Sequence, residues 1–177
     1  PAIAVGRVRN VGYPVAVVVA GTPEQARDAA ERVDVDYEIL PAVVSAYAAA
    51  RPDAPQLYDD CPGNEAYFYE AGDAAATAAA FARADHIVEQ HLVINRVTAA
   101  TIEPRACVGA YDPVDERYTI HSGQQRPHGL RRDLAKQIFG IPEARFRVVA
   151  GDVGGSFGMK GAHYPEHALA LWASHKV

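Results

Sequence analysis

The sequence lacks the cysteine content of a disulfide-linked protein and the long apolar run of a membrane-spanning one. Its 177 residues include two cysteines, one methionine and one tryptophan. Cys61 and Cys107 are too few for a disulfide framework, and each is expected to be a small apolar residue in a reducing compartment. No apolar run approaches the roughly 20 residues that cross a bilayer, since the longest, 15–20, stops at Gly21. These shortages exclude a disulfide-rich secreted domain and a transmembrane helix.

An excess of positive charge is missing as well. The formal net charge is −5 at pH 7, with 17 Lys and Arg against 22 Asp and Glu. A nucleic acid or an anionic membrane would need a basic face, so neither is an expected partner. The chain starts at Pro1 and shows no charged segment followed by an apolar one, so no signal peptide is visible. We expect a cytoplasmic protein and, because Pro1 leads directly into a strand-like segment, an interior piece of a longer chain.

The first 50 residues are typical of a strand, a helix and a second strand. The β-branched run 15–20 predicts a buried strand. The following Thr22-Pro23-Glu24-Gln25 is a capping box with proline at the first helical position, which predicts a helix over 23–33. Apolar and acidic residues then alternate over 35–39, as in a half-exposed strand. Prolines and turn-forming residues over 51–72 predict a linker.

The remaining residues, 73–177, predict a second domain with mixed elements. An alanine-rich helix and a strand-like run come first, and two strands around the turn-forming residues 112–116 predict an antiparallel hairpin. The expected elements are a helix over 73–84, a strand-like run over 86–97, strands over 106–111 and 118–122, a helix over 127–139, a strand over 146–149 and a helix after Pro165. The fold class predicted by this pattern is α+β.

A glycine-rich loop follows the last expected strand. Residues 151–161 contain five glycines, and such a loop can turn its backbone amides toward an anion or toward the oxygens of a cofactor. Lys160 is expected to add a mobile positive charge beside these amides. A phosphate-binding Walker loop does not fit, because Met159 separates Lys160 from Gly158 and Gly161 replaces the hydroxyl residue. The glycines alone leave two interpretations open, a plain turn and a cofactor cradle.

Several motifs, in order along the chain, together resemble one known family. They are Gly12 to Ala20, Val35 to Val43, Ile102-Glu103-Pro104-Arg105, Gln125-Arg126-Pro127-His128 and Asp152-Val153-Gly154-Gly155-Ser156-Phe157-Gly158-Met159-Lys160. The last is similar to the Gly-Gly-Gly-Phe-Gly-x-Lys signature of the molybdenum hydroxylase large subunit, the family of xanthine dehydrogenase, aldehyde oxidase and aerobic carbon monoxide dehydrogenase. The resemblance implies the end of an α/β hammerhead domain over 1–50, the linker, and the first part of a mixed α/β molybdopterin-binding domain over 73–177.

The resemblance also implies which residues approach the cofactor, molybdenum–molybdopterin, expected as the cytosine dinucleotide. The loop residues are Gly154, Gly155, Ser156, Phe157 and Gly158, with amides near the cofactor oxygens and the phenylalanine at the substrate pocket. Gln125 matches the glutamine whose amide NH₂ hydrogen-bonds an oxo ligand, and an amide suits this task because it stays neutral. Gln124 is the alternative in the neighbouring register. Serine at 156 replaces a glycine, so the path of the loop can differ there.

The implied reaction is a hydroxylation with water as the oxygen source, on an aldehyde, a heteroaromatic or carbon monoxide. Purine-oxidising members carry a glutamate directly after the loop lysine; Gly161 stands at that position, which disfavours a purine. Iron–sulfur and flavin subunits or domains, carrying FAD, are the implied partners. The catalytic glutamate is expected beyond Val177, so the piece itself is expected to be inactive. Glu103 is expected to be a structural or cofactor-shell carboxylate.

Two alternatives belong to other classes of function. His163, Glu166 and His167 match the His-x-x-Glu-His pattern of zinc peptidases, in which two histidines share a helical face. Pro165 weakens this interpretation, because proline favours the first helical turn and would leave His163 in the preceding loop. The other alternative is a non-catalytic piece that contributes a surface to a larger assembly.

Overall fold

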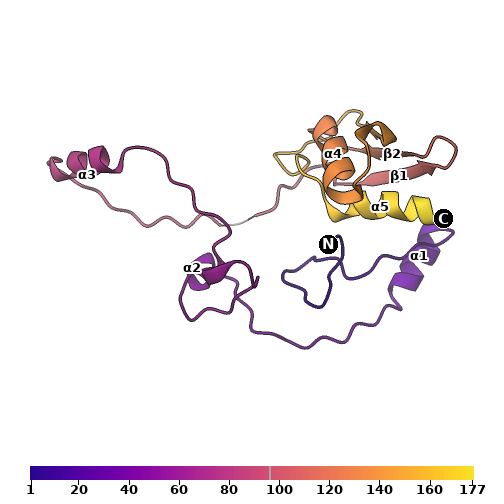
Figure 1. Cartoon of the computed structure of the whole chain (residues 1–177). Helices are drawn as coiled ribbons and strands as arrows, with labels where there is room; N and C mark the ends of the chain where they lie inside the picture. The colour runs from indigo at the N-terminus through magenta and orange to yellow at the C-terminus, as the bar shows by residue number, and fades with distance from the viewer. Residues whose placement is uncertain (96) are drawn as a thin grey trace. The chain divides into compact units, whose positions relative to one another are not determined.

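The computed structural model describes residues 1–95 and 97–177 (Figure 1). The chain divides into two compact units, one of Pro1–Asp34 with Arg96–Val177 and the other of Val35–Asn95. The larger unit contains the sheet and the glycine-rich loop. Among the residues described, no helix has both the length and the apolar character that a membrane crossing requires.

A mixed three-stranded sheet forms the centre of the larger unit. β1 (Cys107–Asp112) and β2 (Arg117–Ser122) form the predicted antiparallel hairpin, with Tyr111 opposite Tyr118. The Asp112 carboxylate accepts hydrogen bonds from the amides of Val114 and Asp115 in the turn. β3 (Phe146–Val149) runs parallel to β2 in the order β1-β2-β3, and its predicted bounds are confirmed.

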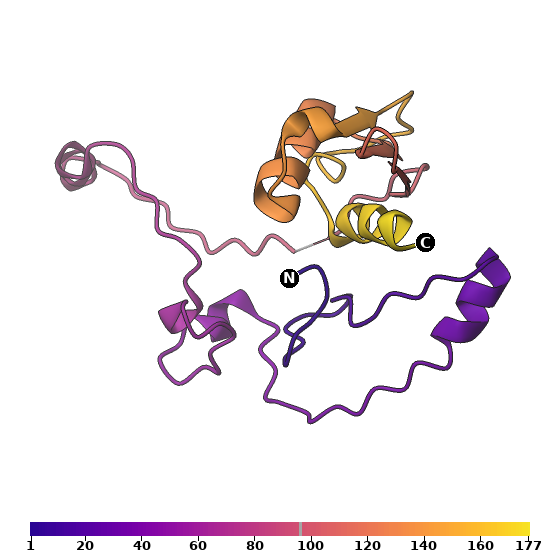
Figure 2. The ribbon, with the colours of Figure 1, turned by 45° about the vertical axis from the view of Figure 1, so that its right-hand side comes forward.

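Two helices pack on one face of this sheet (Figure 2). α5 (Pro165–Lys176) contacts β1, and α4 (Pro127–Asp133) contacts β3. The core between helices and sheet consists of Tyr118, Ile120, Leu130, Leu134, Ala135, Phe146, Ala168 and Leu171. α5 approaches β1 so closely at Gly109 that a Cβ there would lie 2.8 Å from backbone atoms of Ala170. The sheet and the helices together confirm the α+β class.

The predicted helix over 127–139 is present, with a change of winding. α4 continues into a π-helical segment, η2 (Leu134–Phe139), and a 3-10 turn, η3 (Glu143–Arg145), precedes β3. Gly140 ends the helix at φ 66°, in the left-handed region that glycine adopts without strain. The continuous α-helix expected from the apolar spacing was therefore wrong in its second half.

The two predicted helices outside the core are present, and each begins after a side chain that caps it. Thr22 accepts from the amide of Gln25 at 3.2 Å and starts α1 (Pro23–Ala30), which ends before the predicted Val33. Asp73 accepts from the amide of Ala76 at 2.8 Å and starts α3 (Ala74–Ala82). The segment predicted to be a linker also holds a 3-10 turn, η1 (Pro62–Asn64), and the short α2 (Ala46–Ala49) precedes it.

The strands predicted in the first part of the chain are wrong in this structure. Within the described residues, 15–20 and 35–39 take no strand assignment. The described part of the run 86–97 is also not a strand, and residue 96 lies outside the described residues. A strand forms only when its backbone groups pair with a neighbour, and among described residues these segments have no such neighbour.

Candidate functional site

The glycine-rich loop between β3 and α5 turns sharply at three positions. Gly155 (φ 97°), Gly158 (φ 90°) and Phe157 (φ 51°) lie in the left-handed region. Two of them are glycines, for which this costs little, whereas Phe157 carries strain and a side chain that is 83% exposed. Ser156 is not in this region, so serine adopts the loop conformation at that position without backbone strain. The loop thus presents an aromatic side chain to its surroundings.

An ion pair fixes the start of the loop to the segment before β1. Lys160 is 1% exposed, and its Nζ lies 2.5 Å from Oε2 of Glu103. The same Oε2 accepts from the amide of Gly154 at 2.7 Å, and the Glu103 amide donates to the Gly154 carbonyl at 3.2 Å. The Lys160 hydrogen bond, followed by that of Gly154, lowers the pKa of the Glu103 carboxyl. The mobile charge predicted for Lys160 is therefore wrong, because its ammonium is buried and paired.

Glycine is required at 154 and 155 for different reasons. A Cβ on Gly154 would lie 2.6 Å from Cβ of Glu103, so the close approach of the two segments excludes a side chain. A Cβ on Gly155 would meet only Thr101, at an ordinary 3.5 Å. There the positive φ opposes substitution, because L side chains rarely adopt it.

Gln125 is attached to the same loop through Ser156. The Ser156 hydroxyl donates to Oε1 of Gln125 at 2.5 Å and accepts from the Lys160 amide at 2.9 Å. The Gln125 amide in turn donates to the Lys160 carbonyl at 3.0 Å. A Cβ on Gly161 would lie 3.2 Å from Oε1 of Gln125, so this glycine leaves space for the side-chain carbonyl. The structure therefore brings together Gln125 and the loop residues predicted from sequence.

The two candidate glutamines have different surroundings. Gln124 is 5% exposed, and its Nε2 donates to the carbonyl of Ala162 at 3.2 Å. Gln125 is exposed, and its Nε2 makes no hydrogen bond within the part of the chain that the structure describes. Gln124 thus ties two segments together, whereas Gln125 keeps two N–H donors available for a ligand.

The backbone of the loop adds further donors. The amides of Ser156, Phe157 and Gly158 have no acceptor among residues 1–95 and 97–177, while the amides on either side are paired. A Cβ on Gly158 would meet nothing within 4 Å, so the space beside it is open. The donor set consists of N–H groups without net charge, which fits a group that presents oxygen acceptors, as a molybdopterin centre does.

The zinc-peptidase interpretation is wrong in this structure. The side chains of His163, Glu166 and His167 are bound to separate partners and do not meet at one point. Those partners are Asp133 at 3.4 Å for His163, Arg105 at 2.9 Å for Glu166, and the Tyr164 amide at 3.1 Å for His167. Over the described ranges, no three His, Cys, Asp or Glu side chains could hold a metal ion. Pro165 begins α5 and leaves His163 outside it, as the sequence indicated.

His167 has a structural task. It is 2% exposed, and burial, as the largest cause, lowers the pKa of its imidazole. Nδ1 accepts from the Tyr164 amide, so the ring proton of the neutral form is on Nε2, which lies 3.4 Å from the Ser122 hydroxyl. His167 thereby connects the first turn of α5 to the end of β2.

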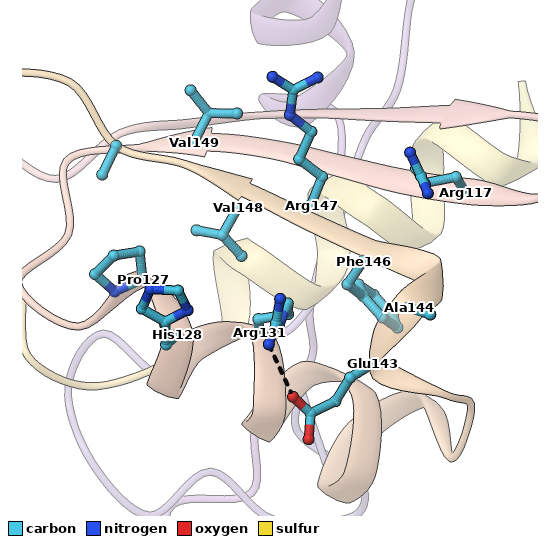
Figure 3. A pocket seen from close by; sticks show the side chains of 11 residues that line it. Arg117, Pro127, His128, Arg131, Glu143, Ala144, Phe146, Arg147, Val148 and Val149 are labelled. Atoms are coloured by element: carbon cyan, nitrogen blue, oxygen red, sulfur yellow. Dashed lines mark hydrogen bonds and ion pairs between the residues drawn. The ribbon is translucent and has the colours of Figure 1, made fainter.

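One hollow of the larger unit is lined by none of the loop residues 151–161 (Figure 3). It has a volume of about 590 Å³ between α4 and β3. Arg131 in it is paired with Glu143 at 3.4 Å, and Arg147 points to the opposite side of β3. Its positive groups therefore do not converge on a ligand. A second hollow of about 460 Å³, beside the start of α4, is the one that includes Gln125.

Comparison with known proteins defines the class. Residues 57–177 match the family described as the molybdopterin cofactor-binding domain. Residues 1–41 match the a/b hammerhead domain of aldehyde oxidase and xanthine dehydrogenase. The chain therefore belongs to the aldehyde oxidase and xanthine dehydrogenase family of molybdopterin-binding proteins, and the predicted succession of a hammerhead end and the start of a cofactor-binding domain is confirmed.

Individual relatives agree with this family. The chain is 38% identical over 172 residues to the carbon monoxide dehydrogenase large chain of Hydrogenophaga pseudoflava, covering 90% of this chain and 21% of that protein. It is 37% identical over 175 residues to the 6-hydroxypseudooxynicotine dehydrogenase complex subunit gamma of Paenarthrobacter nicotinovorans, covering 98% and 21%. The crystal structure of quinoline 2-oxidoreductase from Pseudomonas putida 86 superimposes with a TM-score of 0.82 at 32% identity, covering 99% and 22%. The chain thus spans about a fifth of the length of these relatives.

Sequence reasoning named Lys160 and Ser156 but missed the contacts through which they hold this site in place. Burial of Lys160 against Glu103 has no signal in a glycine-rich segment, because the partners are far apart in the chain. The bond of Ser156 to Gln125 was also missed, although the departure from glycine marked the position. A hydroxyl at a position where the family signature has no side chain was the available signal.

Proposed function

We propose that the chain is part of the catalytic large subunit of a molybdenum hydroxylase, in which Gln125 and residues 154–158 hold the molybdopterin cofactor. The observation that carries this proposal is a set of donors that have no acceptor among the described residues, Nε2 of Gln125 and the amides of residues 156–158, while the amides of Gly155 and Met159 on either side are paired. When bound, the cofactor supplies a two-electron oxidation in which an oxygen atom from water enters the substrate.

The residues of the chain bind and orient in this scheme. Gln125 donates its NH₂ to an oxygen atom of the cofactor and stays neutral throughout. The amides of the loop donate to neighbouring oxygens, and Gly158 leaves room for the group to approach the backbone. Phe157, exposed in the structure, lies at the edge of the substrate pocket. The proton-abstracting glutamate is proposed to lie outside these residues, so the chain alone should be inactive.

The proposed substrate is an aldehyde, a heteroaromatic ring or carbon monoxide. Gly161 offers no side chain where purine-oxidising members carry a glutamate, so a purine is disfavoured. The names of the similar proteins include a carbon monoxide dehydrogenase and a quinoline oxidoreductase. Rates on carbon monoxide, quinoline, benzaldehyde and xanthine test this proposal, with xanthine expected to be the poorest substrate.

The proposal extends to the assembly. Partner subunits or domains with iron–sulfur clusters and FAD would carry electrons away, and a relative is itself named as a subunit of a complex. The cofactor is proposed to be the cytosine dinucleotide, which acid hydrolysis would release as a cytidine nucleotide. Domain limits of 1–50, 51–72 and 73–177 and a cytoplasmic location complete the proposal.

Metal analysis of the enzyme that carries this chain tests the function directly. We expect molybdenum bound to the subunit, and a Gln125→Ala variant whose kcat falls about tenfold or more, since one donor to the reacting group is lost. The control is Gln137→Ala, an exposed glutamine on η2 that donates to Asp133, which should keep both rate and metal. A wild-type enzyme without molybdenum, or a fully active Gln125→Ala variant, would contradict the proposal.

A further inference from the structure

Ser156 stands where the family signature has a glycine, and its hydroxyl donates a hydrogen bond to Oε1 of Gln125. Resting on the proposed function, we propose that Ser156 is a positioning residue that fixes the side-chain amide of Gln125 with its NH₂ directed to the cofactor. The hydroxyl itself does not touch the cofactor in this proposal. It acts through the glutamine.

The number of donors around Ser156 Oγ determines which end of the Gln125 side-chain amide faces the hydroxyl. A serine hydroxyl has one proton to donate and can accept as well. The Lys160 amide is a donor, so Ser156 Oγ accepts there and keeps its own proton free. Ser156 is 9% exposed, and a buried hydroxyl proton needs an acceptor. Oε1 of Gln125 satisfies it, whereas the reversed amide would present a second donor and leave the hydroxyl proton unpaired.

The hydroxyl is itself held by a rigid support. Lys160, whose amide donates to Ser156, is buried and paired with Glu103. The backbone N–H of Gln125 also donates to the Lys160 carbonyl, which fixes the backbone on both sides of the Ser156 contact. Gly161 leaves the space that Oε1 occupies. The position of the side-chain amide of Gln125 is therefore set by residues of the chain and not by the cofactor.

Without the hydroxyl, the glutamine would lose its orientation. Gln125 is exposed, and the terminal torsion of a glutamine is broad and nearly two-fold, so the amide would populate both orientations. The reversed form directs a carbonyl oxygen toward an oxygen of the cofactor, which is unfavourable. We expect Ser156→Ala to lower kcat about five- to tenfold, the usual weight of one hydrogen bond.

A double-mutant cycle on the holoenzyme tests this inference. The variants are Ser156→Ala, Gln125→Ala and the double variant, with Ser174→Ala as control, since Ser174 donates only to a helix carbonyl in α5. The measurements are kcat, molybdenum per subunit after gel filtration, and the electron paramagnetic resonance spectrum of the partially reduced enzyme, in which molybdenum carries one unpaired electron. We expect Ser156→Ala to shift this spectrum and the rate in the wild-type background and to change neither when Gln125 is already alanine. Ser156→Thr, which keeps the hydroxyl, should restore the wild-type spectrum.

The opposite results separate this inference from the function on which it rests. If Ser156→Ala lowers rate and metal equally in both backgrounds, Ser156 supports the loop through Lys160 alone and the positioning role is wrong. If Gln125→Ala matches the wild type in every measurement, the proposed function fails and the inference fails with it. Should Ser156→Ala not accumulate, Ser156→Gly, the residue of the family signature, takes its place in the cycle.

Discussion

At the scale of single residues, the loop depends on one buried charge. Lys160→Met keeps the length of the side chain and removes the partner of Glu103, so the tie between the Ile102–Arg105 segment and Gly154 is weakened. We expect amide hydrogen exchange over 151–161 to become about tenfold faster, because one partner of a charge-assisted bond is lost. Hydrogen-exchange mass spectrometry measures it.

A matched surface lysine provides the control for this change. Lys136 pairs with Glu143 at 3.3 Å, but its side chain is 65% exposed. Exposed pairs contribute little, so Lys136→Met should leave exchange within about twofold of the wild type. Equal effects of the two substitutions would show that the Glu103 pair does not hold the loop.

The pH dependence of stability is a second property of one residue. Burial lowers the pKa of His167, so the unfolded chain binds more protons than the folded one between that lowered pKa and the ordinary value of about 6.5. Stability is then fully present above about pH 6.5 and falls as the pH decreases toward the folded pKa. Hydrogen exchange of the α5 amides, corrected for intrinsic rates, should show this loss of stability at lower pH. In His167→Asn the loss between the same pH values should be smaller. A substitution of exposed His86 is the control, and an unchanged slope in His167→Asn would contradict the assignment.

Motifs in the sequence predicted which residues form the site. They did not predict contacts between residues that lie far apart in the chain. Gln125 and the glycines follow from the resemblance of their motifs to the family, and in the structure Gln125 is hydrogen-bonded to the loop that contains the glycines. The buried state of Lys160 could not be predicted, because lysine is usually exposed and Glu103 lies far from it in the chain. Only the fold shows that this charge fixes the loop.

At the scale of elements, the contact of α5 with β1 requires glycine at 109. A Cβ there would lie 2.8 Å from the carbonyl carbon and oxygen of Ala170, which cannot move without the helix. Gly109→Ala should therefore lower the local unfolding free energy of β1 and α5 by about 1–3 kcal/mol, the cost of overpacking. Native-state hydrogen exchange gives this quantity. Gly151→Ala, where a Cβ meets nothing within 4 Å, should change it little, and equal losses would refute the steric explanation.

Helices and turns that depend on residues close in sequence could be predicted, whereas strands that depend on distant parts of the chain could not. The caps of α1 and α3 and the hairpin turn rest on bonds between residues close in sequence. The π-helical η2 has no such signal, because apolar spacing does not distinguish it from a continuing α-helix. Strands at 15–20 and 35–39 failed because their pattern records a tendency, while a strand also needs a neighbour.

At the scale of the whole molecule, segments 15–20 and 35–39 have the pattern of strands but no strand neighbour among the described residues. Val17 and Val19 are 40% and 49% exposed, and Ile39 is 93% exposed, although their pattern is that of half-buried or buried strands. The chain spans about a fifth of its relatives. Under the proposed function, the apolar residues of 15–20 and 35–39 would acquire their neighbours from other parts of the large subunit.

Hydrogen exchange in two contexts tests this last expectation. In the 177-residue chain alone, amides of 15–20 and 35–39 should exchange near their intrinsic rates, because no described residue pairs with them as a strand. In the complete subunit they should be protected about a hundredfold or more, as paired strands are. β2, which pairs with β1 and β3 in this structure, serves as the internal control and should be protected in both. Rapid exchange of 15–20 and 35–39 in the complete subunit as well would mean that their strand-like pattern has another cause, since the missing neighbour would then not account for it.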